Sequence, residues 1–214
     1  MSKPLYGRFL PAVLSLSMIS APAGASVIIS EIMYDATGAD AGKVFVELYG
    51  TPGTDLSGYR LLGINGGDGS IYKTIDLSGI VPPDGIFVVA DDAGGGTTSV
   101  PNADLILSVD FQNGPDSVQL LAGGMLLDAV GYGDFTGAVF AGEGTPAPDV
   151  AGGHSLARLI GPQDTDDNAA DFIDLDVPTP GSLPGSTVSP VPLPGALWLF
   201  ASGLGLLTVA RRRS

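Results

Sequence analysis

An acidic loop in the last third of the chain carries oxygen ligands at alternate positions. Asp164, Asp166 and Asn168 are spaced two residues apart, and hard oxygen ligands at this spacing are typical of calcium-binding loops. The loop departs from the EF-hand pattern, because Ala169 stands where that pattern has glycine and Leu175 where it has a bidentate glutamate. The alternative, which we favour, is a set of Asx turns, in which these side chains accept hydrogen bonds from nearby backbone N–H groups. Calcium bound by Asp164, Asp166 and Asn168 is kept as a second hypothesis.

Two glutamates in β-rich segments, Glu31 and Glu47, could act as an acid and base pair. Glycoside hydrolysis uses two carboxyl groups that lie about 5–9.5 Å apart. An acid within a strand is more often structural, held by a basic residue or by backbone. Arg158 is the natural partner, because it is the only basic residue near the end of the β-rich region. We therefore expect a structural ion pair among Glu31, Glu47 and Arg158.

The single histidine of the chain, His154, precedes a serine, Ser155. Successive residues of a strand point to opposite faces, so these two side chains could not share a proton as a hydrolase pair does. The chain also lacks the G-x-S-x-G elbow of serine hydrolases. With one histidine and no cysteine, sites that need two imidazoles or a thiolate are excluded. We expect no catalytic residues and no cofactor apart from the calcium hypothesis.

The charges are distributed unevenly along the 214 residues. All 23 acidic residues lie between Glu31 and Asp176, together with only four basic residues, so this part of the chain carries a net charge of −19. Nucleic-acid phosphates need to be neutralised by lysine and arginine. This charge balance excludes nucleic acid as a partner.

The N-terminal end has the three parts of a secretory signal peptide. Lys3 and Arg8 precede an apolar run, and Ala23 and Ala25 form an A-x-A cleavage signal. This order is typical of export signals that signal peptidase removes. We interpret residues 1–25 in this way and expect the protein to be exported.

The C-terminal end carries an apolar segment, residues 193–210. About 18 apolar residues are just long enough to cross a bilayer as a single transmembrane helix. Arg211, Arg212 and Arg213 follow at once and mark the cytoplasmic side. Before the segment, residues 182–190 are rich in proline, serine and glycine. They predict a semi-rigid linker that holds the preceding domain roughly 30 Å from the membrane.

The region 191–214 also resembles the PEP-CTERM sorting signal, which combines a short proline-containing motif, an apolar helix and a terminal arginine cluster. The motif here consists of Val191, Pro192, Leu193, Pro194 and Gly195, with Leu193 where the family usually has glutamate, as in its V-P-L-P variant. The resemblance implies recognition by an exosortase, a membrane protease that cuts near the motif in Gram-negative cells. It further implies a place at the cell surface or in an exopolysaccharide and biofilm matrix, with transient or permanent anchoring by the helix. A plain membrane anchor is the alternative.

The region between the two ends shows β patterning. Short β-rich runs alternate with clusters of glycine, proline, aspartate and asparagine, as in all-β sandwiches and barrels. We predict strands at residues 26–33, 43–49, 59–64, 72–77, 85–90, 104–107, 117–121, 126–130 and 154–158. In the second of these, Val44, Val46 and Leu48 are expected to face the core. Phe45 and Tyr49 on the other face indicate that this strand is covered on both sides.

The motifs of residues 26–181 resemble, in order, the lamin-tail domain, an immunoglobulin-like β-sandwich found in nuclear lamins and in secreted bacterial proteins. Nine segments carry the resemblance: residues 29–34, 45–49, 55–61, 81–89, 116–120, 128–133, 155–158, 164–172 and 178–181. One departure is Gly50, where the family usually has asparagine. The resemblance implies an all-β, immunoglobulin-like sandwich, and this family is too broad in function to imply an activity.

These observations together predict an exported cell-envelope protein with a non-catalytic adhesion or scaffold domain. Its expected partners are the two processing enzymes, the membrane, and an exopolysaccharide or surface protein. A calcium-dependent module that binds polysaccharide or protein is the alternative, and a secreted hydrolase that uses Glu31 and Glu47 is the third hypothesis.

Overall fold

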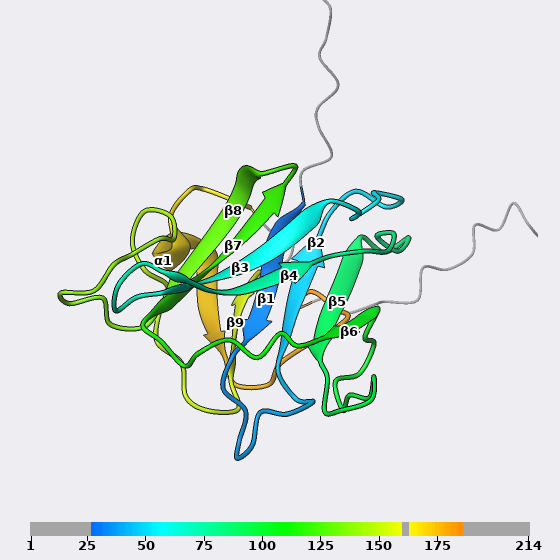
Figure 1. Cartoon of the computed structure of the whole chain (residues 1–214), viewed down its shortest axis with the longest axis horizontal. Coiled ribbons are helices and arrows are strands. Elements are labelled where there is room, and N and C mark those ends of the chain that lie inside the picture. The colour runs from blue at the N-terminus through cyan, green and yellow to red at the C-terminus, as the bar shows by residue number, and fades with distance from the viewer. Residues whose placement is uncertain (1–26, 160–162, 186–214) are drawn as a thin grey trace, which may run out of the picture.

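Two β-sheets form the part of the chain that the computed structural model describes, residues 27–159 and 163–185 (Figure 1). The first sheet has the order β10-β9-β1-β2-β5-β6 and the second the order β4-β3-β7-β8. The first comprises β1 (Ile28–Met33), β2 (Phe45–Tyr49), β5 (Ile86–Asp91), β6 (Leu105–Leu107), β9 (Ser155–Arg158) and β10 (Phe172–Leu175). The second comprises β3 (Tyr59–Asn65), β4 (Ile71–Asp76), β7 (Asp116–Ala122) and β8 (Met125–Tyr132). One helical turn, α1 (Asn168–Asp171), precedes β10.

The all-β prediction is confirmed, and each of the nine predicted segments overlaps a strand. Neighbouring strands pair antiparallel, apart from β5 and β6, which are parallel. A tenth strand, β10, was not predicted; it has four residues and pairs with β9 alone among the described strands. An edge strand this short has no long alternating pattern, so pairing with its neighbour decides its conformation.

The main core lies between the inner faces of the two sheets. The inward-facing residues of the strands supply it, because successive side chains of a strand point to opposite faces. An irregularity in β1 between Ile29 and Glu31 shifts this alternation there. Ile29 and Ile32 of β1, Val46 of β2, Leu61 of β3 and Val118 of β7 belong to this cluster and are inaccessible to solvent. Val44, Val46 and Leu48 are buried as predicted.

A second, smaller core covers the outer face of the first sheet. It contains Phe45, Val88 and Val100, so β2 is covered on both faces, as the sequence indicated. We call residues 177–185, which lead from β10 to the end of the described chain, the C-terminal strap. Leu183 of the strap packs against this second core, although it lies in the predicted linker 182–190. The packed part of the protein therefore extends at least to Leu183.

The predicted signal peptide, residues 1–25, and the sorting region, residues 191–214, lie outside the described residues. The same is true of the apolar segment 193–210. Among the residues that are described, no helix has the length and apolar character needed to cross a membrane.

Candidate functional site

A buried arginine lies where the two sheets meet. Arg158, in β9, has no solvent-exposed surface. Its Nη2 lies 3.1 Å from Asp128 Oδ1, and its Nη1 lies 2.8 Å from Asp171 Oδ2. Its Nε donates to the backbone oxygen of Ile29 at 2.9 Å, and Nη1 also donates to the backbone oxygen of Gln163 at 2.7 Å. Two carboxylates and two carbonyls thus compensate a charge that would otherwise be costly to bury.

The acidic partners of Arg158 connect separate elements of the fold. Asp128 lies in β8 of the second sheet, and its Oδ2 accepts the backbone N–H of Ile29, in β1 of the first sheet, at 2.6 Å. Asp171 lies in α1, and its carboxylate also accepts from the N–H and hydroxyl of Thr165. Burial alone would raise the pKa of Asp171, but the hydrogen bonds from Thr165 and Arg158 outweigh it and hold this pKa below its usual range. Arg158 therefore binds both sheets and the acidic loop together.

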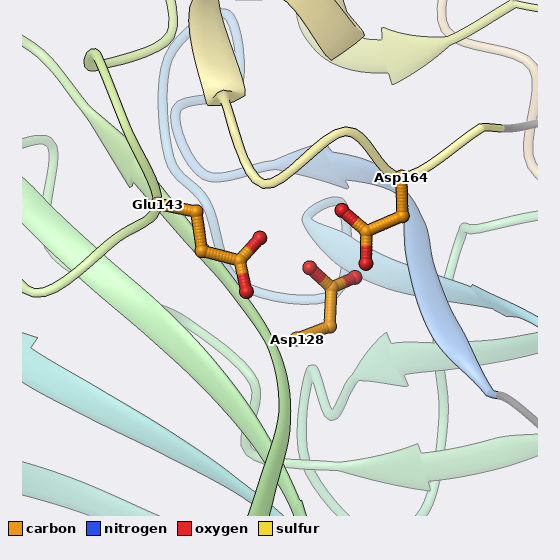
Figure 2. Close-up of side chains that lie close together, drawn as sticks. All are labelled: Asp128, Glu143 and Asp164. Carbon is orange, nitrogen blue, oxygen red and sulfur yellow. The ribbon is translucent and has the colours of Figure 1, made fainter.

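Three carboxylates near Arg158 lie close together, and Figure 2 shows them pointing toward one another: Asp128, Glu143 and Asp164. One oxygen of each lies within 4.8 Å of the others. Arg158 Nη2 lies 3.7 Å from Asp164 Oδ1 and is therefore close to the same group. We call these three residues the acidic triad. They come from β8, from the loop between β8 and β9, and from the loop before α1, so only the folded chain brings them together.

Glu143 is the member of the triad with an unsatisfied atom. Its Oε2 is buried and has no hydrogen-bond partner among the described residues. Burial, and then the charges of Asp128, Asp164 and Asp166, raise the pKa of Glu143 to about 8. Hard oxygen ligands of this kind suit either a shared proton or a cation such as calcium.

The ligand set predicted for calcium is not assembled. The amide oxygen of Asn168 accepts the backbone N–H groups of Gly131, at 2.9 Å, and Glu143, at 3.0 Å, and its Nδ2 donates to the oxygen of Ala129 at 2.8 Å. Asn168 thus holds buried backbone and has no free ligand atom. Asp164 accepts the N–H of Asp166 at 3.2 Å, the Asx turn of the alternative reading. Of the three predicted ligands, only Asp164 joins the triad.

Asp128 and Glu143 were not among the predicted site residues. Asp128 had a recognisable signal, since it is a charged residue within an otherwise apolar run, Leu126–Val130, and a charge in such a strand needs a partner. Glu143 lies in a glycine-rich loop and had no such signal. Its position depends on Asn168, which binds the Glu143 backbone from 25 residues away.

Glu31 and Glu47 lie opposite each other on β1 and β2, and both are fully buried. The expected ion pair with Arg158 is wrong, because Arg158 is occupied by Asp128 and Asp171. Glu31 instead accepts from the hydroxyl of Ser155 at 2.6 Å, and from the N–H and hydroxyl of Thr179 at 2.9 and 2.8 Å.

Glu47 accepts from the hydroxyl of Ser30 at 2.8 Å and from the N–H of Gly181 at 2.8 Å. Because Thr179 and Gly181 belong to the C-terminal strap, the two glutamates fasten the strap to the sheet. Burial raises the pKa of both carboxyls, that of Glu47 to about 7, with a further contribution to Glu47 from the charge of Glu31. A buried, fully bonded pair offers a substrate no access, so the geometry gives no support to the hydrolase hypothesis.

His154 and Ser155 point away from each other, as expected. His154 Nδ1 lies 2.8 Å from Asp174 Oδ1 in β10, whereas the Ser155 hydroxyl donates to Glu31. His154 immediately precedes β9 and Ser155 is its first residue, and the two side chains make different contacts.

Comparisons with protein-family models, with curated proteins and with solved structures find no match for this chain.

Replacing Arg158 tests its central role. In the chain of residues 27–185, Arg158→Ala leaves the buried carboxylates of Asp128 and Asp171 uncompensated, and we expect a loss of about 3–5 kcal/mol in the free energy of unfolding. Urea denaturation measures this. The control is Arg60→Ala, which removes the exposed pair with Asp76 and should cost at most about 1 kcal/mol. Equal losses in the two variants would contradict the assignment.

Glu47 gives a prediction about pH. Its folded pKa of about 7 exceeds its ordinary value of 4.5, so between these pH values the folded chain holds a proton that the unfolded chain has lost. The free energy of unfolding should therefore fall as pH rises through this window. Glu47→Gln, whose amide can donate to Ser30 and accept from Gly181, should flatten this dependence and stabilise the protein at pH values above about 7.

Urea denaturation at a series of pH values checks this expectation. The slope should decrease without vanishing, since Glu31 also titrates with a raised pKa. Asp76→Asn, a change at an exposed carboxyl, should leave the slope as it is. An unchanged slope in Glu47→Gln would show that Glu47 is ionised throughout this range.

Proposed function

We propose that this protein is an exported, exosortase-sorted component of the cell surface or extracellular matrix, with a lamin-tail-like, immunoglobulin-like sandwich as a non-catalytic adhesion or scaffold module. The observation that carries the proposal is the C-terminal strap. It is fastened by Glu31 and Glu47 and packed through Leu183. A domain whose C-terminal end is bound this firmly is suited to being held by a tether.

The way the buried charges are used supports a structural role. Arg158, Glu31, Glu47 and Asn168 each bond to groups from distant parts of the chain. In a catalytic site, by contrast, some of these groups would keep hydrogen-bonding capacity for a substrate. The order of motifs that resembles the lamin-tail domain also fits the two-sheet arrangement.

The two ends of the chain support export and sorting. Signal peptidase would act after Ala25, and an exosortase would act near Val191–Gly195. Because Leu183 packs on the second core, only residues 184–190 remain as linker before that motif, and they would place the sandwich roughly 20 Å from the membrane. A domain whose residues between Glu31 and Asp176 carry a formal net charge of −19 would remain soluble there and would favour partners such as exopolysaccharide or a surface protein over nucleic acid.

Expression in a Gram-negative host that carries an exosortase tests sorting. The full chain should appear at the surface, shortened at both ends, and should increase attached biofilm mass. A variant with Arg211, Arg212 and Arg213 replaced by alanine should lose C-terminal processing, and a chain that stops after Pro190 should be released without anchoring. Fractionation, mass spectrometry and biofilm staining measure these outcomes. A full chain that stays in the cytoplasm with residues 1–25 intact would overturn the proposal.

Calcium binding is the second candidate function, and the unpartnered Oε2 of Glu143 in the acidic triad favours it. A cation there would stabilise the native state, because it would bind the folded chain alone. We expect millimolar calcium to raise the melting temperature of residues 27–185 by several degrees over EDTA, and Glu143→Gln to abolish the rise. Asp166→Asn, outside the triad, is the control. An equal melting temperature of the unmodified chain in calcium and in EDTA would refute calcium binding at the triad. Arg158 would then be the group that balances the charge of the triad.

A further inference from the structure

The chain contains two Asn-Gly dipeptides, Asn65–Gly66 and Asn113–Gly114, in different surroundings. Asn-Gly is the dipeptide most prone to spontaneous deamidation, because glycine has no side chain to obstruct its backbone nitrogen. From their contacts we propose that Asn113 is a self-modification site, at which water and the chain's own backbone convert asparagine to aspartate and isoaspartate. Asn65 is protected by the fold.

The reaction needs only the groups of the chain itself and one water molecule. The backbone nitrogen of Gly114 loses its proton and attacks Cγ of Asn113, forming an N–Cγ bond as the Cγ–Nδ2 bond breaks and ammonia leaves. Water then opens the five-membered succinimide ring at one of its two carbonyls. Opening at one carbonyl gives aspartate, and opening at the other gives isoaspartate, whose main chain is one atom longer.

The groups that react at Asn113 are accessible. Asn113 and Gly114 are both exposed, in the loop that leads to β7. Neither the Asn113 side chain nor the Gly114 N–H takes part in a hydrogen bond within the described residues 27–159 and 163–185. The nitrogen is thus free to lose its proton to solvent, and the side chain is free to approach it.

The fold also retains glycine at this position. Gly114 has a φ of 91°, which disfavours residues with a side chain, and an added Cβ would lie 3.3 Å from the ring of Tyr132. A bulkier residue would slow the reaction, but the loop does not readily accept one.

The same groups at Asn65 are held in place. The Gly66 N–H donates to buried Asp116 Oδ1 at 2.8 Å, and the Gly67 N–H donates to Asn65 Oδ1 at 2.6 Å. The Asn65 backbone is also bonded to Ser70 and Gly69 across the turn. Gly66 is buried, and an added Cβ would lie 1.9 Å from the oxygen of Pro115. Attack would require breaking a hydrogen bond to a charged acceptor in this tightly packed turn.

Conversion at Asn113 would affect neighbouring contacts. The adjacent residue, Gln112, accepts from the Tyr132 hydroxyl at 2.9 Å, and its N–H donates to the Tyr72 hydroxyl at 3.0 Å. An extra main-chain atom and a new negative charge would enter between this anchor and Asp116, where β7 begins. The converted protein should therefore melt at a lower temperature than the fresh protein.

The test compares the two sites in the same molecules. Full-length chain in detergent micelles is aged at mildly alkaline pH, and peptide mapping by mass spectrometry follows each asparagine. A parallel sample is aged in concentrated urea. In the folded sample we expect Asn113 to convert at least about tenfold faster than Asn65, because a hydrogen bond to a charged group must first break at Asn65. In urea the two rates should become similar.

Two variants sharpen the test. Asn113→Gln should prevent both the main conversion and the fall in melting temperature on ageing. Asp116→Asn, which removes the charge that holds Gly66, should raise the rate at Asn65 and leave Asn113 reacting. The proposal is overturned if Asn65 converts as fast as Asn113 in the folded chain, or if Asn113 remains intact there while it converts in urea.

Discussion

The burial of one guanidinium constrains the rest of the structure. Arg158 can remain charged in the interior only if carboxylates and carbonyls surround it, because an uncompensated buried charge is very costly. Its partners come from β1, β8, the loop after β9 and α1. The requirement to satisfy one side chain therefore fixes how the two sheets meet and where the acidic loop lies. The ring of Phe172, 4.4 Å from the guanidinium carbon, completes the enclosure.

The second group of buried charged residues, Glu31 and Glu47, must likewise have its polar atoms satisfied. Glu31 and Glu47 lie side by side without a basic partner, and hydroxyl and backbone donors satisfy them instead. Burial raises the pKa of both carboxyls, and the hydrogen bonds from these donors lower it again only in part. The stability of the strap site therefore varies with pH, whereas the Arg158 group depends on charge pairing. The Arg158 group joins the two sheets where they meet, and the two glutamates hold the C-terminal strap on an outer face of the first sheet.

The acidic triad is a consequence of the Arg158 group. Asp128 is an ion-pair partner of Arg158, and Asp164 lies in the loop that Asp171 anchors. The side chain of Asn168 accepts the backbone N–H of Glu143 and so holds Glu143 beside them. Four acidic side chains around one cation leave an excess of negative charge. Burial first, and then this excess charge, raises the pKa of Glu143. This excess distinguishes the triad from a closed ion pair and makes it the place where a proton or metal ion would matter.

Local pattern was enough to determine the all-β character, the positions of nine strands and the two-sided burial of β2. Each of these follows from the alternation of side chains along a strand, which adjacent residues already contain. The opposite orientations of His154 and Ser155 follow in the same way. Export and sorting signals are likewise contiguous, and they remain predictions from the sequence.

Only the tertiary structure decided which charges meet. Arg158 pairs with Asp128 and Asp171, and not with Glu31 and Glu47, because of the order of the strands. In the first sheet β9 pairs with β1 and β10, and Asp128 reaches Arg158 from β8 of the second sheet. The use of Asn168 as a backbone clamp and the contrast between Asn65 and Asn113 depend equally on residues distant in sequence. Hydrogen bonds and ion pairs act over a few ångströms of space, and a linear pattern does not specify which remote groups the fold brings within that range.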